Sequence, residues 1–147
     1  MRLWHYELLP YLPELQFEGQ LRELVAIMKD LKYKKQTNHI LINKVMEYDK
    51  VELLRYFDAY CKEYSYRYSR EVSEAIQDDF WDFSGVCAIF FKEGIFENWH
   101  NKEYLRVCMA NLYEKHKFDV GKSRITDEEW QTLLNGYKQI TGEDYVI

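Results

Sequence analysis

The sequence predicts an all-α protein of 147 residues in a single domain. Only six glycines and two prolines are present, so the residues that make tight turns are scarce. Apolar side chains recur at helical spacing along most of the chain. Two pairs, Asp49 with Glu52 and Thr126 with Glu129, have the spacing of an N-terminal capping box. These observations indicate five or six helices and argue against a β-sandwich or barrel.

The first long helix is predicted over residues 13–31. Pro13 suits a first helical turn, where its missing N–H has no intrahelical partner to lose. Gly19 weakens this helix slightly. The apolar residues that we expect on its buried face are Leu15, Leu21, Leu24, Val25 and Met28.

Shorter elements follow this helix. A polar, basic connector at 29–39 leads into a short helix over 39–47, for which Thr37 or Asn38 is the expected N-cap. A further helix is predicted over 49–66, because its apolar residues line one face. It begins at the Asp49–Glu52 pair.

The segment 70–93 is ambiguous. Its first half has a helical pattern, whereas the run VCAIFF in its second half fits a buried helix or a buried strand equally well. In so short an apolar run, periodicity cannot distinguish a buried helix from a buried strand.

Two helices are predicted in the last third of the chain. One covers 101–117, with Asn98 or Asn101 as its N-cap and an apolar face that includes Cys108. The last helix begins at the Thr126 capping box, and Gly142 stands where a C-terminal stop belongs.

Charge is distributed unevenly along the chain, whose formal net charge is −5. Residues 1–70 carry 12 Lys and Arg against 10 Asp and Glu, whereas 71–147 carry 8 against 15. The segment 71–101 alone holds seven acidic residues against Lys92. Because non-specific affinity for nucleic acid depends on neutralising phosphates, the net charge argues against it.

Cysteine and histidine give no signal of a metal site. Cys61, Cys87 and Cys108 form no CxxC pair, and the four histidines lack metal-ligand spacing. An odd cysteine count without a signal peptide fits a reducing cytoplasm, where we expect three buried, unreactive thiols. No run approaches the roughly 18 apolar residues of a membrane span.

The opening of the chain carries a resemblance to a known family. MRLWH, followed by LPYLPELQFEGQLRE, resembles the start of the pyrimidine-dimer DNA glycosylases, endonuclease V-like enzymes. YDKVELLRYF at 48–57 is a second match, and HNKEYLRVCMANLYEK at 100–115 is a weaker one. The resemblance covers 1–66 well, and 69–97 reads as an acidic insertion.

This resemblance implies an all-helical DNA glycosylase with abasic-site lyase activity and no cofactor. Its nucleophile would be the α-amine of Met1, and its essential carboxylate would be Glu23. An α-amine has a pKa of roughly 7.7–8.0 against about 10.4 for lysine, so a useful fraction is neutral at pH 7. We expect Met1 to persist because Arg2 is bulky, and any leader would block the amine.

The resemblance also suggests residues that hold DNA phosphates. They are Arg2, Arg22, Lys29, Lys32, Lys34, Lys35 and Lys115. The alternatives to a functional role are a surface Arg22–Glu23 pair and a solvated basic connector. The sequence departs from the family's phage member, which has a histidine where Gln16 stands and an arginine near Val25 and Ala26. Specificity for dimers is therefore the least secure implication.

Two functions remain open. The first is a cytoplasmic DNA-repair glycosylase and abasic-site lyase acting on pyrimidine dimers or another lesion. The second is a non-catalytic helical protein of the same fold that binds a protein partner through 71–101. The enzyme requires Met1 and Glu23 to lie within a few ångströms of each other. The binding protein requires an exposed Glu23 paired with a neighbouring lysine.

Overall fold

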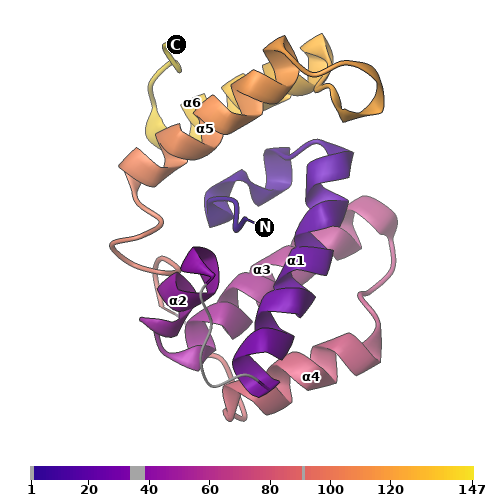
Figure 1. Cartoon of the computed structure of the whole chain (residues 1–147), viewed down its shortest axis with the longest axis vertical. Coiled ribbons are helices and arrows are strands. Elements are labelled where there is room, and N and C mark those ends of the chain that lie inside the picture. The colour runs from indigo at the N-terminus through magenta and orange to yellow at the C-terminus, as the bar shows by residue number, and fades with distance from the viewer. Residues whose placement is uncertain (1, 34–38, 91) are drawn as a thin grey trace. The chain divides into compact units, whose positions relative to one another are not determined.

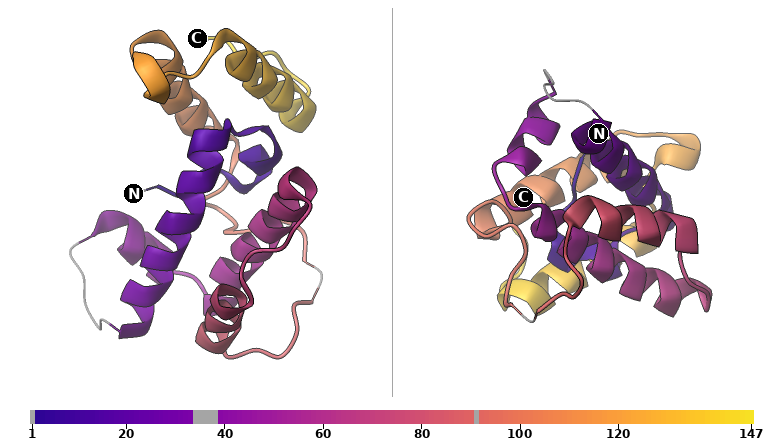
Figure 2. Two further views of the ribbon diagram at one scale, coloured as in Figure 1. Left: turned by 90° about the vertical axis from the view of Figure 1, so that its right-hand side faces the viewer. Right: turned by 90° about the horizontal axis from the view of Figure 1, so that it is seen from below.

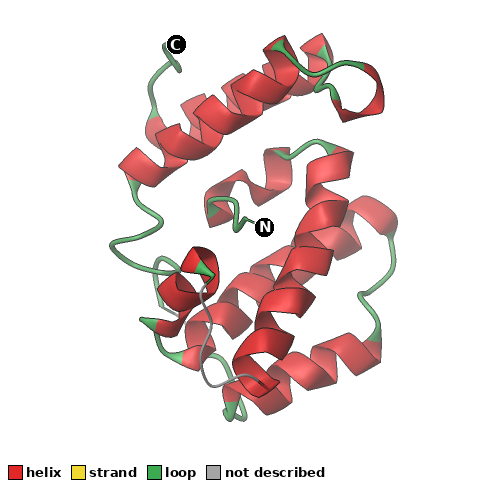
Figure 3. Ribbon diagram, in the orientation of Figure 1, coloured by secondary structure: helices red, strands yellow, loops and turns green. Residues whose placement is uncertain are grey.

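The computed structural model describes residues 2–33, 39–90 and 92–147 (Figure 1). Within these residues the chain is helical and contains no strand, which confirms the predicted all-α class (Figure 3). The elements are the 3₁₀ helices η1 (Tyr6–Tyr11) and η2 (Gly121–Ser123) and the α-helices α1 (Glu14–Tyr33), α2 (Ile40–Met46), α3 (Lys50–Tyr68), α4 (Glu74–Ser84), α5 (Lys102–Lys117) and α6 (Asp127–Thr141).

The chain forms two compact units. The first unit contains Met1–Leu3 and Gln20–Phe96, and the second contains Trp4–Gly19 and Glu97–Ile147. Each unit therefore combines a piece of the N-terminal region with a longer later segment. The expectation of a single domain over 1–147 stays a prediction.

The core of the first unit lies where α4 packs along α3 (Figure 2). The rings of Phe57 and Phe80 stack with centroids 3.9 Å apart and planes 5° from parallel. In the same unit, α1 contributes Leu24, Ile27 and Met28, all of which are buried. Burial of such side chains is the main favourable term in folding, about 1.5–3 kcal/mol for each.

The buried face of α1 differs in part from the predicted one. Leu24 and Met28 are buried as expected, but Leu15 is 49% exposed. The buried row instead includes Phe17, at 0% exposure, and Gln20, at 1%. These residues, with Leu24 and Ile27, follow the i, i+3, i+4 spacing of one helix face, and Leu15 falls outside it.

The expected capping box at the start of α3 is absent. Asp49 does occupy the N-cap position, but its side chain makes no capping hydrogen bond. Glu52 turns inward instead, where it pairs with Arg55 at 2.9 Å and accepts a hydrogen bond of 3.0 Å from the Phe96 backbone N–H. Arg55 also donates to the Lys92 carbonyl. A buried guanidinium competes for this carboxylate more strongly than a solvated cap does.

The run VCAIFF is neither helix nor strand at its described positions. Gly85 ends α4 in the left-handed conformation, with φ 71°. Cys87 and Phe90 beyond it are exposed. The expectation of three buried thiols is therefore wrong for Cys87, while Cys108 is buried. Cys61 is half-buried, and burial raises the pKa of its thiol to about 12.

The other helix ends agree largely with the sequence. The N-cap position of α2 is His39, and the expected caps Thr37 and Asn38 lie outside the described residues. Asn101, rather than Asn98, caps α5 by accepting from the Tyr104 N–H at 2.8 Å.

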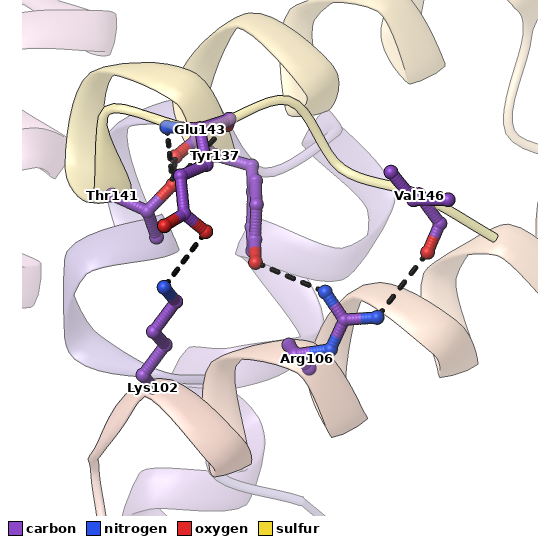
Figure 4. Close-up of polar contacts among 6 residues, drawn as sticks. All are labelled: Lys102, Arg106, Tyr137, Thr141, Glu143 and Val146. Atoms are coloured by element: carbon purple, nitrogen blue, oxygen red, sulfur yellow. Dashed lines mark hydrogen bonds and ion pairs between the residues drawn. The ribbon is translucent and has the colours of Figure 1, made fainter.

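In the second unit, α5 and α6 pack together and α6 also packs on η1. The Thr126 capping box is present, and Gly142 ends α6 with φ 76°. Figure 4 shows side chains of α5 reaching the end of α6: Lys102 pairs with Glu143 at 2.8 Å, and Arg106 donates to the Tyr137 hydroxyl at 3.2 Å.

Gly136 on α6 permits a close approach within this unit. A Cβ atom at this position would lie 2.6 Å from a ring carbon of Tyr11 in η1. Only glycine therefore lets the tyrosine ring rest against the helix backbone.

We predict that Glu52→Gln destabilises the protein by about 3 kcal/mol, because it leaves a buried guanidinium without its counter-charge. Urea unfolding at pH 7 measures the change. Asp58→Asn is the control on the same helix: its pair with Lys62 is exposed and is worth at most about 1 kcal/mol. Equal losses in the two variants would contradict the prediction.

Candidate functional site

The backbone of Arg2 is bound on both sides by side chains of α1. Its N–H donates to Glu23 Oε2 at 2.7 Å, and its carbonyl accepts from Gln20 Nε2 at 2.8 Å. Gln20 and Glu23 are three residues apart and so project from the same face of the helix. The next residue, Leu3, is fully buried and anchors the segment.

Tyr56 on α3 extends this arrangement into the core. Its hydroxyl donates to Gln20 Oε1 at 3.0 Å, and both side chains are almost completely buried. Since the hydroxyl donates to Oε1, the amide nitrogen of Gln20 faces the Arg2 carbonyl. We call these four residues, Arg2, Gln20, Glu23 and Tyr56, the N-terminal cluster. All four belong to the first unit.

The carboxylate of Glu23 is therefore half-buried beside the second residue of the chain. A partly desolvated carboxylate next to the N-terminal backbone suits proton transfer to and from a group held there.

The predicted DNA-binding residues are spread over both units. Arg22 and Lys29 are exposed on α1, whereas Lys32 forms an ion pair of 2.9 Å with Asp82 of α4, which raises the pKa of Lys32. Lys115 lies on α5 in the second unit. Met1, Lys34 and Lys35 lie outside the described residues.

Sequence reasoning missed two members of the N-terminal cluster, Gln20 and Tyr56. Gln20 stands in the stretch Gln-Leu-Arg-Glu, and its spacing of three from Glu23 already implied a shared helix face. No local pattern connects Tyr56 with Gln20, which is 36 positions away.

A second cluster gathers in the second unit around two histidines. His5 Nε2 donates to the His100 carbonyl at 3.0 Å, while His5 Nδ1 accepts from the Glu7 N–H at 3.2 Å. His100 Nδ1 accepts from the Tyr6 N–H at 3.1 Å. The two imidazoles thus take the place of capping side chains at the start of η1.

Burial lowers the pKa of both imidazoles. The pKa of His5 falls to about 4, although backbone hydrogen bonds partly offset the effect, and the pKa of His100 falls to about 2, with a further contribution from His5. Both rings are therefore neutral at pH 7. They contribute to the wall of a pocket of about 220 Å³, with Glu7, Asn101, Lys102, Leu105, Ile140 and Thr141.

The first unit also has an open groove at the start of α4. Glu71, Glu74 and Asp78 give it a negative charge, and Trp81 is half-buried beside them. Across the described ranges, no group of three or more His, Cys, Asp or Glu residues is arranged to hold a metal ion. None of the helices in those ranges is long and apolar enough to cross a membrane.

Comparison with known proteins gave one match. The family model for pyrimidine dimer DNA glycosylase matches residues 1–74, just over half of the chain. The matched range contains the whole N-terminal cluster. Searches of curated proteins and of solved structures found no match.

Because of the buried His5–His100 pair, we predict that the free energy of unfolding falls in mild acid. The pKa of each folded-state imidazole lies below its ordinary value of 6.5, so only the unfolded chain gains these protons when the pH falls below 6.5. Their contribution to the free energy of unfolding is complete above pH 6.5 and declines towards pH 4. Urea unfolding at pH 7 and pH 5 measures it.

His5→Asn retains an acceptor for the Glu7 N–H and removes one of the two titrating rings. We therefore expect this variant to lose less stability than the native protein between the two pH values. The exposed His39 supplies the control, because His39→Asn removes an imidazole outside the pair. Identical pH dependence in all three proteins would refute this role of the pair.

Proposed function

The chain belongs to the pyrimidine dimer DNA glycosylase family, and from this premise we propose that it is a cytoplasmic DNA-repair glycosylase and abasic-site lyase. The α-amine of Met1 would be the nucleophile, and Glu23 would transfer protons. The single observation that carries the proposal is the 2.7 Å hydrogen bond from the Arg2 N–H to Glu23. The proposal includes a mature chain that begins at Met1.

Covalent geometry supports the pairing of the amine with Glu23. Three bonds of about 1.3–1.5 Å separate an N-terminal nitrogen from the nitrogen of the next residue, which limits their separation to less than about 4 Å. Because the Arg2 nitrogen touches Glu23 Oε2, the amine has only a short distance to reach the same carboxylate.

In the first step, the neutral amine attacks C1′ of the deoxyribose at the lesion. The C1′–base bond breaks, and the base leaves with the bonding electrons and takes up a proton. The nitrogen, which became cationic on attack, first loses a proton to Glu23. Its lone pair then forms a C1′=N bond (a protonated imine) as the sugar ring opens, and O4′ retains the electrons of the C1′–O4′ bond and is protonated. Glu23 is the proposed proton carrier for these transfers.

In the second step, Glu23 removes a proton from C2′. The electrons of the C–H bond form a C2′=C3′ double bond, and the 3′ phosphate leaves with the electrons of the C3′–O bond. Water finally hydrolyses the imine, which releases the unsaturated sugar and regenerates the amine.

The cationic side chains proposed to hold the substrate have the phosphates of the damaged strand as their targets. Arg2 and Arg22 are nearest in sequence to the cluster, and the exposed Lys29 lies two helical turns further along α1. Lys32 must exchange Asp82 for a phosphate, which lowers its net contribution. Lys34, Lys35 and Lys115 complete the proposed set.

A second candidate function is a binding protein that uses the acidic segment 71–101. The groove at Glu71, Glu74 and Asp78 favours it, because its carboxylates suit a basic protein partner. This function requires no reaction at the N-terminus, so it predicts a protein inert towards abasic sites.

We expect Glu23→Gln to slow strand cleavage at an abasic site by about 10²–10⁴-fold, since an amide carries no proton between atoms. Single-turnover assays on two oligonucleotides, one with an abasic site and one with a pyrimidine dimer, measure the loss. Glu14→Gln, an exposed residue on the same helix, is the control and should cleave at the native rate.

A native protein that cleaves the abasic site but not the dimer would restrict the function to the lyase reaction. Equal rates for the native protein and Glu23→Gln would overturn the role of Glu23.

A further inference from the structure

We infer that Gln20 and Tyr56 are positioning residues, which fix the N-terminal amine against Glu23 through the backbone of Arg2. This inference rests on the proposed function. Both side chains are buried, and each acts through the next: Tyr56 orients Gln20, and Gln20 holds the Arg2 carbonyl.

Two hydrogen bonds limit the freedom of the Arg2 backbone. Terminal residues are poorly ordered unless they are tied down. A hydrogen bond to the Arg2 N–H alone would leave the segment free to rotate about that contact. The second bond, from Gln20 to the Arg2 carbonyl at 2.8 Å, fixes the other side of the residue. Together, the two bonds fix both sides of the Arg2 backbone.

The amide of Gln20 can make its contact with Arg2 in only one orientation. An amide has a donor end and an acceptor end, and only the donor end can bind the Arg2 carbonyl. The Tyr56 hydroxyl selects this orientation, because it donates to Oε1 at 3.0 Å. Both side chains are at most 1% exposed, so bulk water offers no substitute partner.

Misplacement of the nucleophile lowers the rate of its reaction. Reaction of an oriented nucleophile depends on the reacting atoms being held about 3–3.5 Å apart, and a shift of 1 Å costs about 10²-fold in rate. Loss of the Gln20 contact removes one of the two bonds that fix Arg2. We therefore expect a loss of about 10–100-fold in imine formation.

The test uses borohydride trapping of the untagged full chain on an oligonucleotide with one abasic site. Gln20→Leu keeps the approximate volume and removes both polar ends. Tyr56→Phe removes one oxygen and is the fallback if Gln20→Leu does not fold. Tyr60→Phe, a buried tyrosine one turn along α3, is the matched control. We expect slower trapping in the first two variants and the native rate in the third.

Gln20→Glu separates positioning from stability. An ionised carboxylate cannot donate to the Arg2 carbonyl, whereas a protonated one can. The trapping rate of Gln20→Glu relative to the native protein should therefore rise as the pH falls from 7 to 5. Circular dichroism at each pH verifies that both proteins are folded, and a purely structural role predicts a constant ratio.

The outcomes distinguish the two proposals. Trapping by the native protein with unchanged rates in folded Gln20→Leu and Tyr56→Phe would overturn the positioning role and leave the proposed function standing. No trapping by the folded native protein with a free α-amine would overturn both. Slower trapping in the two variants, with a pH-dependent ratio for Gln20→Glu, supports both.

Discussion

Two side chains three residues apart on α1 bind the backbone of Arg2, and the placement of the N-terminal segment depends on that constraint. Glu23 accepts from its N–H and Gln20 donates to its carbonyl. A free chain end would lose considerable entropy on being fixed, and a buried Leu3 together with two hydrogen bonds offsets that loss. The Tyr56 hydroxyl links the same arrangement to α3, so the N-terminal segment is tied to the core of its unit.

The first unit contains a buried ion pair, Glu52 with Arg55, and an exposed acidic helix, α4. Glu52 and Arg55 are both at most 9% exposed and fix the segment from Lys92 to Phe96 through backbone contacts. In contrast, α4 presents its carboxylates to solvent, and Asp82 pairs with Lys32. An acidic element of this kind disfavours non-specific binding to the phosphates of undamaged duplex DNA.

Local patterns predicted the helices because helical spacing and caps depend on neighbouring residues. The Thr126 capping box and the Gly142 stop were read correctly from the sequence. The predicted capping box at Asp49 was wrong. Glu52 pairs instead with Arg55, three residues along, and accepts a hydrogen bond from the Phe96 N–H, 44 residues along. Local patterns also could not predict the His5–His100 and Tyr56–Gln20 contacts, because the partners lie far apart in the sequence. The family resemblance suggested Glu23 as a candidate, whereas its contacts with the Arg2 backbone required the folded chain.

We propose the N-terminal amine as the nucleophile and Glu23 as its proton carrier. Peptide mapping by mass spectrometry of the borohydride-reduced complex with an abasic oligonucleotide tests this proposal most directly, once native Met1 has been verified. The account predicts a covalent adduct on residue 1 that disappears when the α-amine is blocked before mixing. An adduct on a lysine side chain, or none from folded protein with a free Met1 amine, would contradict it.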